Sequence, residues 1–478
     1  MRLSAICAVA FLAPGIAGAQ SLDDVSRAMG ADNIKTIQYS GSGHLYAVGQ
    51  SIHPQEPWPR FNLKSYTLTA NYETASMTLE QSVTQGENPP RGGGRQPVTG
   101  VQKRNSGLSG DTGWTWRGRN AGPNRNTAGA LHALWTSPHG VIKALQAANS
   151  PLGTKTVGGK TFRTASFGKQ GAFRAIAWFG KDNLLRGVDA WIANPVFGDM
   201  HVATVYSDYK TMGGLKFPTR ISSKTEGFPS FDLKVAKVLA NAAADIKTPE
   251  GLRGGGGRVK TDKVADGLWY VTGGSHHSVV VEMKDYIVVI EGPLGDRRAK
   301  AVIKAARDLV PGKPIRFVVN THHHFDHSGG LRAFAAEDVT IVTHNINVPF
   351  YKRIYADKHS LRPDALAKSG KRAKFLGVGE KYVMTDGTRS MELHLVKGNL
   401  HNAGMLIAHL PAEKVMIVAD VYSGRSLEKA PIDPKKVSVF TANLWENLQR
   451  LKLDIETVLP IHGQKVGFEQ VRFAAGQP

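Results

Sequence analysis

The sequence predicts an α+β protein of two domains, a mainly antiparallel β domain followed by one in which strands and helices alternate. Three observations support this prediction. The chain has 478 residues, more than one hydrophobic core usually serves. Four consecutive glycines lie within residues 249–260, and such a run does not hold a packed element. The spacing of apolar residues also differs on its two sides. We therefore expect one domain over residues 20–248, a linker over 249–260 and a second domain over 261–478.

The first nineteen residues are typical of a secretory signal peptide. Arg2 precedes an apolar run, and the small residues 17–19 follow it, which predicts cleavage after Ala19. An uncleaved membrane anchor is the alternative, but Pro14 and Gly15 interrupt a run that is already short for a spanning helix. We therefore expect a soluble protein exported to the periplasm or secreted.

The single cysteine, Cys7, lies in this predicted signal segment. Disulfides and thiolate ligands are therefore excluded from the mature chain, and a transition-metal site must use His, Asp and Glu. The formal net charge of +21 is shared by both halves of the chain, which argues against a dedicated nucleic-acid surface.

One local excess of positive charge lies in a stretch rich in glycine and proline. Two interpretations of it remain open, a solvated loop and a contact with anionic lipid of the cell envelope. The stretch contains Arg91, Arg95, Lys103, Arg104, Arg117, Arg119 and Arg125.

The region before the linker has mainly the pattern of strands. Apolar residues alternate from Tyr66 to Tyr72, the period of a half-buried strand. Only residues 127–149 have a helical pattern, with an expected break at residues 138–140. A long antiparallel meander with one helical insert predicts a strongly curved sheet. Around residues 206–221, "YSDYKTMGGLKFPTRI", it is similar to the half-barrels of periplasmic lipoprotein carriers.

The region after the linker has a different pattern. Three short strands are expected within residues 267–293, an amphipathic helix over 297–312 and a buried strand over 314–320. Strand, helix and strand followed by a polar loop is α/β architecture, in which catalytic groups belong at the carboxyl ends of the strands.

That polar loop, "THHHFDHSGG" at residues 321–330, carries the clearest chemical signal. In an extended segment alternate residues point the same way, so His322 and His324 can share a face while His323 points elsewhere. Asp326 and His327 follow at the turn and can reach a second position. The pattern supplies two imidazoles for one ion and a carboxylate with an imidazole for another. An affinity tag or a solvated loop is disfavoured, because the run is internal and follows an apolar strand.

This motif resembles the signature of the metallo-β-lactamase superfamily, whose fold is an αββα sandwich. The resemblance implies three further ligands, a histidine after a strand, a bridging carboxylate and a closing histidine. His401, Asp420 and His462 occur in that order and in the expected local context.

The resemblance also implies two divalent ions, with zinc expected, that share a hydroxide. One ion would be bound by His322, His324 and His401, and the other by Asp326, His327 and His462, with Asp420 bridging both. Asp326 is expected to orient the hydroxide as well, and is the candidate catalytic residue.

Several other polar residues lie near these positions in the sequence. Glu291 stands where many relatives have Asp, and we expect it behind the ligands rather than among them. His394 and His409 lie on expected strands and are interpreted as structural. His276 and His277 lie in a loop that can border the pocket.

The expected activity is cleavage of an ester, lactone or thioester-type bond in a small molecule. A bridging Asp420 without any cysteine ligand argues against β-lactam turnover as the primary activity. Two interpretations of a basic excursion at residues 344–381 remain open, a solvated helix face and a lid that favours an anionic substrate. The half-barrel favours an acylated substrate by analogy.

Three alternatives remain open. The first is a phosphodiesterase or sulfatase, and the second is an envelope lipid-binding or carrier protein with a vestigial metal site. An iron-dependent oxidoreductase ranks lowest, because no flavin or thiol partner is visible. No nucleic-acid partner is expected, and the oligomeric state is not predicted.

Overall fold

The computed structural model describes residues 21–124, 126–157, 159–252 and 257–478. The expected signal segment, Arg125 of the basic stretch and residues 253–256 of the expected linker lie outside the described residues. Among the residues described, no helix is both long enough and apolar enough to span a membrane.

The N-terminal region is one large antiparallel sheet, as the sequence predicts. Its thirteen strands follow the order β6-β5-β4-β3-β2-β1-β13-β12-β11-β10-β9-β8-β7. Their bounds are β1 Thr36–Tyr46, β2 Arg60–Asn71, β3 Ser76–Gln85, β4 Gln102–Ser109, β5 Thr112–Arg117, β6 Asn120–Pro123, β7 Gly153–Val157, β8 Lys160–Lys169, β9 Phe173–Phe179, β10 Leu185–Asn194, β11 Gly198–Met212, β12 Leu215–Thr225 and β13 Phe228–Ala240.

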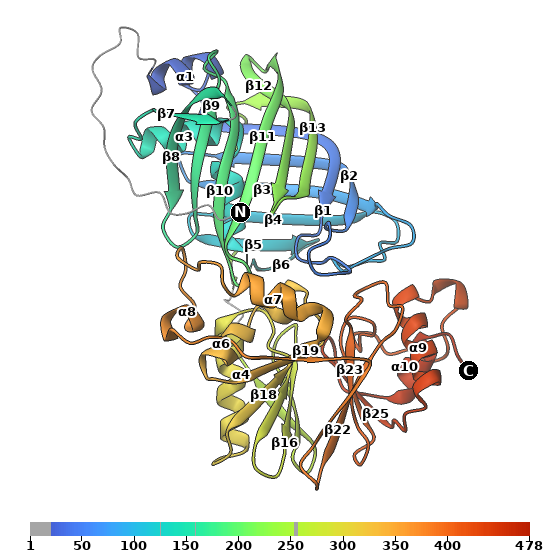
Figure 1. The fold of residues 1–478 in the computed structure, drawn as a ribbon. Coiled ribbons are helices and arrows are strands. Elements are labelled where there is room, and N and C mark those ends of the chain that lie inside the picture. Colours follow the sequence, from blue (N-terminus) through green and yellow to red (C-terminus); the bar gives the residue numbers. More distant parts are fainter. Residues whose placement is uncertain (1–20, 125, 158, 253–256) are drawn as a thin grey trace.

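This sheet curls around two helices. Strands β1 to β5 run across the direction of β9 to β13 in Figure 1, and α2 (Thr127–Trp135) contacts β4 and β5 as well as β9 and β10. The helical pattern breaks where the sequence predicts, because Pro138 begins α3 (Pro138–Ala147). A third helix, α1 (Leu22–Met29), packs against α3.

The C-terminal region contains two further sheets. One has seven strands in chain order, and the other has six. The first comprises β14 Lys260–Ala265, β15 Leu268–Thr272, β16 Ser278–Glu282, β17 Ile287–Ile290, β18 Ile315–Val319, β19 Thr340–His344 and β20 Phe375–Val378. The second comprises β21 Lys381–Thr385, β22 Ser390–Leu395, β23 Leu406–Leu410, β24 Val415–Val418, β25 Thr457–Pro460 and β26 Val466–Gly467.

The two sheets pack face to face, with helices on their outer sides (Figure 1). Val279 and Ile290 of the first sheet share a buried apolar core with Leu393 and Ile407 of the second. Burial of each such side chain contributes about 1.5–3 kcal/mol. The helices are α4 Asp296–Leu309, α5 Phe325–Ser328, α6 Leu331–Ala336, α7 Val348–Ile354, α8 Ala365–Ser369, α9 Val439–Leu451 and α10 Phe468–Ala474, with 3-10 turns η1 Asn345–Asn347 and η2 Pro434–Lys436. The result is the αββα layering that the sequence predicts.

The excursion at residues 344–381 contains the expected helices, and it contacts the N-terminal domain. The backbone carbonyl of Lys358 accepts a hydrogen bond of 2.8 Å from the amide of Asp199, and the Asp199 carboxylate accepts one of 2.9 Å from the amide of Leu361. Phe350 of α7 packs at 5.8 Å between ring centroids against Phe197. The excursion therefore forms part of the contact between the two domains.

Candidate metal centre

Polar residues follow three strands of the sandwich at their carboxyl ends. Residues 320–327 follow β18 in the first sheet, whereas Asp420 follows β24 and His462 follows β25 in the second. Strands β24 and β25 are parallel neighbours, so the residues after them emerge at one edge of the sheet. The edges of both sheets meet there, and all seven residues that the sequence predicts as ligands come together.

The first group contains His322, His324, His401 and Asp420. One possible ligand atom from each lies within 4.8 Å of all the others. The ring centroids of His322 and His324 are 4.5 Å apart, and those of His324 and His401 are 4.7 Å apart. The three imidazoles are buried, so the group can enclose one cation.

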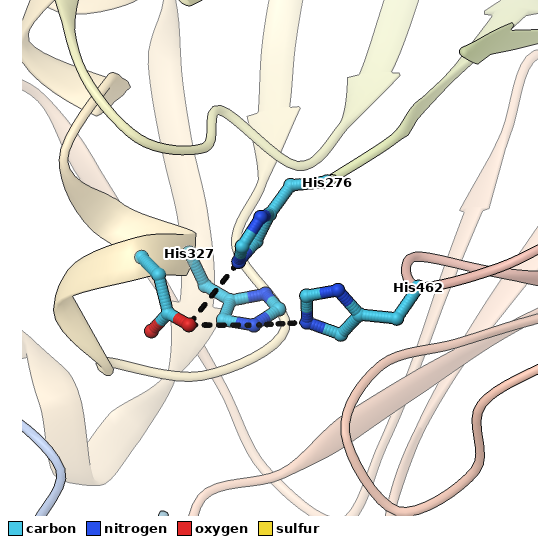
Figure 2. A group of neighbouring side chains, drawn as sticks. His276, His327 and His462 are labelled. Carbon is cyan, nitrogen blue, oxygen red and sulfur yellow. Dashed lines mark hydrogen bonds and ion pairs between the residues drawn. The ribbon is translucent and has the colours of Figure 1, made fainter. Parts of the chain in front are cut away.

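The second group contains Asp326, His327 and His462, together with His276. Figure 2 shows the three imidazoles converging from separate segments of the chain, His327 from the short helix α5 and His276 and His462 from loops. The Nε2 atoms of His327 and His462 lie 3.3 Å apart, and Nε2 of His276 lies 3.1 Å from Oδ2 of Asp326. This group adjoins the first, because the ring centroids of His322 and His327 are 4.2 Å apart.

Asp420 lies between the two groups. Its Oδ2 atom is 3.1 Å from Nε2 of His401, whereas its Oδ1 atom is 2.8 Å from Nε2 of His327 and 2.9 Å from Nε2 of His462. Each carboxylate oxygen therefore faces a different group, which is the geometry that a bridging ligand requires.

Hydrogen bonds from outside the centre fix how these imidazoles point. Nδ1 of His322 lies 3.0 Å from Oγ1 of Thr321, and Nδ1–H of His462 donates to the carbonyl of Ser275 at 2.8 Å. Such contacts are typical of metal-binding histidines, since they hold the tautomer that turns the other nitrogen toward the ion. They leave Nε2 of both histidines facing the centre.

Outside the group itself, the nitrogens that face the first group have no hydrogen-bond partner among the described residues. Within the described residues, Nε2 of His322 and Nδ1 of His324 are buried without a hydrogen-bond partner, and Nε2 of His401 faces only the Asp420 carboxylate. Buried polar atoms are rarely left unpaired, and neutral imidazole and carboxylate suit zinc and similar divalent ions. The residues present therefore fit the metal that the sequence motif implies.

Glu291 lies behind the centre, as the sequence predicts. Its Oε2 atom accepts a hydrogen bond of 2.7 Å from Nδ1 of His327, and its Oε1 atom accepts one of 2.6 Å from the amide of Thr321. Neither the Glu291 nor the His327 side chain is exposed to solvent. The glutamate orients the histidine without joining either group.

Burial and charge set the protonation of the two groups. Burial lowers the pKa of His322 well below its ordinary value and that of His324 to about 3, which favours the neutral form that binds metal. At His327 burial acts in the same direction, but the carboxylates of Asp420, Glu291 and Asp326 outweigh it and raise the pKa. The three carboxylates thus make the electrostatic potential at His327 negative, which favours a cation in the second group.

Residues 271–462 match the sequence model of the Metallo-beta-lactamase superfamily. This part of the chain belongs to the metallo-β-lactamase superfamily. Membership of this superfamily indicates that the protein is an enzyme, a metal-dependent hydrolase.

One curated relative matches part of this chain. It is the 2,4-dinitroanisole O-demethylase subunit alpha of Nocardioides sp. (strain JS1661), 24% identical over 173 residues. The match covers 36% of this chain and 49% of the relative, so the chain spans about half the length of this relative.

Solved metallo-β-lactamase structures also match. The enzyme from Pontibacter korlensis is 18% identical at a TM-score of 0.33, covering 46% of this chain and 97% of its own. That from Hirschia baltica is 18% identical at a TM-score of 0.35, covering 46% and 98%. The mono-zinc form of FIM-1 from Pseudomonas aeruginosa is 17% identical at a TM-score of 0.34, covering 45% and 93%.

Three histidines near the motif residues have different environments. His276 belongs to the second group, which its position in a border loop did not predict. His277 points away from the centre, with Nδ1 2.6 Å from the Tyr270 hydroxyl. His323 also points away, as the alternation predicts, and its Nδ1 accepts a hydrogen bond of 2.9 Å from Asn402. The motif "GGSHHS" signalled histidines near the pocket, but not which one faces it.

A third group of possible metal ligands lies outside the centre, formed by Glu392, His394 and His409. Lys381 already places its ammonium 2.8 Å from Oε1 of Glu392, and His409 donates from Nε2 to the carbonyl of Asp454 at 3.0 Å. The positive charge of the Lys381 ammonium opposes the binding of a metal ion to the same Glu392 carboxylate. We therefore keep the structural interpretation of both histidines in the metallo-β-lactamase domain.

Proposed function

We propose that the protein is an exported binuclear metallohydrolase that cleaves an ester, lactone or thioester-type bond in a small molecule. The position of Asp420 carries the proposal, because each of its carboxylate oxygens faces one group of possible ligands. The signal-like residues 1–19 support export to the periplasm.

Two divalent ions, with zinc expected, would lower the pKa of a shared water toward neutrality and polarise the substrate oxygen. The side chains of His322, His324 and His401 would hold one ion. Those of Asp326, His327 and His462 would hold the other, and Asp420 would span both. His276 would add a third nitrogen donor, and a fourth side chain, at the second site.

Asp326 is the residue we assign to proton handling. Its Oδ1 atom accepts a hydrogen bond of 2.9 Å from Nε2 of Gln50, and its Oδ2 atom lies 3.1 Å from Nε2 of His276. Burial opposes ionisation, but the neighbouring His327 charge and the His276 hydrogen bond outweigh it and lower the Asp326 pKa. An ionised carboxylate in a fixed orientation can accept and direct the proton of the attacking water.

We further propose that the substrate is anionic, because arginines gather beside the second group. Nη2 of Arg425 lies 3.1 Å from Nδ1 of His462. Burial and the nearby charges of Arg117 and Arg425 lower the pKa of Arg95. In the part of the chain that the structure describes, none of the three forms an ion pair with Asp or Glu. Uncompensated guanidinium groups from both domains suit a carboxylate, phosphate or sulfate.

The same arginines favour one second candidate, a phosphodiesterase or sulfatase. A panel of substrates separates the two reaction types. Ester and lactone cleavage is measured with nitrophenyl acetate, an anionic aryl ester and a lactone, and phosphodiester cleavage with bis-nitrophenyl phosphate. The panel also includes 2,4-dinitroanisole, because the name of the partial relative contains that compound.

The deciding experiment combines metal analysis with this panel. We expect two divalent ions per chain and turnover of an ester or lactone that a chelator abolishes and added zinc restores. Asp420→Ala should retain at most one ion and lose at least about a hundredfold in kcat. Full metal content and full activity in that variant, or metal without turnover of any substrate, would contradict the proposal.

A further inference from the structure

The connection between β1 and β2, residues 47–59 of the N-terminal domain, lies across the metal-binding motif. The carbonyl of Gly49 accepts a hydrogen bond of 3.2 Å from the amide of Phe325, and that of Ile52 accepts one of 2.9 Å from the amide of Ala403. One connection is thus bonded to both ligand-bearing loops of the first group. Contacts of this kind fix the relative position of the two loops.

The same connection sets the orientation of a predicted ligand. Nε2–H of His324 donates a hydrogen bond of 2.9 Å to the carbonyl of Ser51. A ring that carries its proton on Nε2 has its lone pair on Nδ1, and Nδ1 is the nitrogen left buried without a partner among the described residues. The tautomer of His324 is therefore fixed by a backbone group of the other domain.

Gln50 reaches the second group. Its Oε1 atom accepts a hydrogen bond of 3.0 Å from the amide of Gly94, and this donor determines which end of the side-chain amide is oxygen. The NH2 end consequently faces Asp326, where Nε2 donates to Oδ1 at 2.9 Å. One carboxylate oxygen of Asp326 is thus held by the N-terminal domain, while the other lies beside His276.

A second segment of the N-terminal domain supports Gln50. The amide of Gly92 donates a hydrogen bond of 2.7 Å to the carbonyl of Leu400, the residue before His401. A Cβ atom added at Gly93 would lie 2.0 Å from Oε1 of Gln50 and 3.0 Å from Cε1 of His324. Only glycine allows the backbone to approach the centre this closely.

We propose that the N-terminal domain is a working part of the metal centre, with Gln50 as a positioning residue for Asp326. The Gln50 amide holds the Asp326 carboxylate in the orientation that completes the second site, and the Ser51 carbonyl does the same for His324 in the first. This inference rests on the proposed metal centre, but not on the proposed reaction or substrate.

The test measures metal binding by the full-length chain without any substrate. Apoprotein is titrated with Co²⁺, and the visible spectrum and competition with a chelator give the affinity of each step. Gln50→Ala removes the amide, and Gln50→Met removes it while keeping the volume of the side chain. Gln55→Ala serves as the control, because Gln55 is an exposed glutamine in the same connection.

We expect both Gln50 variants to bind the first ion within twofold of wild type. The second ion should bind about 10- to 100-fold more weakly, the usual effect of losing a group that orients a ligand, with a changed Co²⁺ spectrum. Gln55→Ala should match wild type.

Three outcomes would overturn the proposal or separate it from the proposed function. The proposal would be overturned if Gln50→Met bound both Co²⁺ ions with wild-type affinity and gave the wild-type visible spectrum. Equal weakening of both ions would also overturn the role of Gln50, because general loosening of the connection disturbs His324 through Ser51. Absence of Co²⁺ binding by wild type would refute the metal centre itself.

Discussion

His327 donates a hydrogen bond of 2.7 Å from Nδ1 to Oε2 of Glu291, and both side chains are completely buried. The other nitrogen of His327 lies 2.8 Å from the bridging Asp420. The imidazole is thus held between two carboxylates, one outside the centre and one within it. Glu291 has a positive φ of 71°, so the chain accepts an unfavourable backbone conformation at this position.

Replacement of Glu291 by Gln should weaken the second metal site. The neutral amide accepts more weakly than the carboxylate, and its NH2 end faces one of the two N–H donors that Glu291 now satisfies. We expect the affinity for the second ion to fall about 10- to 100-fold, measured by chelator competition. Asp285→Asn, the same loss of charge at an exposed position between β16 and β17, is the control, and equal affinities in the two variants would contradict this role.

Replacement of Gly49 by Ala should disturb the centre from the N-terminal domain. Gly49 has a φ of +79°, and an added Cβ would lie 2.3 Å from the ring of Phe325, which lies between two predicted ligands. Overpacking typically costs about 1–3 kcal/mol, so we expect a lower Tm and weaker metal binding.

Gly171→Ala is the control that separates the steric contact between the added Cβ and Phe325 from the strain of an alanine at positive φ. Gly171 has a φ of +72° with nothing within 4 Å of an added Cβ. The control should lower the Tm only slightly and leave the metal content unchanged. If both variants lost metal equally, the contact with Phe325 would have no part in the effect.

Loss of Arg95 or Arg117 should affect anionic substrates selectively. A charge-assisted hydrogen bond contributes about 1.5–3 kcal/mol, so Arg95→Ala should raise KM for an anionic ester about tenfold or more. KM for a neutral ester and kcat for both should stay within about twofold. Arg119→Ala, an exposed arginine of the same basic stretch, should have no effect; a loss shared by neutral and anionic esters would refute the anion-binding role.

Asp364 should stabilise the fold in a pH-dependent way. It pairs with Arg332, whose side chain is only 4% exposed, and lies 3.1 Å from Nδ1 of His359. Burial opposes ionisation of Asp364, but hydrogen bonds from His359 and Arg332 outweigh it and hold its pKa well below the ordinary value. Because the folded-state pKa is depressed, the stabilisation is full above a pH of about 4 and is lost as the pH falls further.

Asp364→Ala leaves Arg332 buried without its partner, which typically costs about 3–5 kcal/mol. Chemical denaturation at pH 7 and at pH 3 tests this. The wild type and the variant should differ by less at pH 3 than at pH 7. An equal difference at both pH values would show that the carboxylate charge has no part in the stability.

The predicted ligands were accessible from the sequence in two ways, through local geometry in residues 322–327 and through the resemblance to a known motif for His401, Asp420 and His462. Alternation in an extended segment places His322 and His324 on one side and His323 on the other, and the structure shows that arrangement. Asp420 and His462 follow apolar strands, and the carboxyl ends of β24 and β25 bring them together. These inferences required only strand geometry and the order of a known motif.

The contribution of Gln50 and His276 could not be predicted in the same way. Gln50 lies 276 positions before Asp326, in a polar connection without a motif of its own. His276 and His277 are adjacent and chemically identical, and only the path of the loop after β15 decides which of them faces Asp326. Both cases depend on tertiary packing, which neither residue type nor spacing encodes.

The excursion at residues 344–381 illustrates the same limit. Its helices were expected from the sequence, but its contact with the N-terminal domain through Asp199 was not. Asp199 lies at the start of β11. From the sequence alone, an acidic residue at the end of a strand is normally expected to be exposed to solvent.

The span of the metal centre along the chain bears on how the protein matures. Its contributing residues extend from Gln50 to His462, so almost the whole polypeptide must be synthesised and folded before the centre is complete. In this arrangement the boundary between the two domains does not separate a self-sufficient metal centre from the rest of the chain. A chimera that joins this metallo-β-lactamase domain to a foreign N-terminal domain would have to retain residues 47–59 and 91–96 to inherit an intact centre.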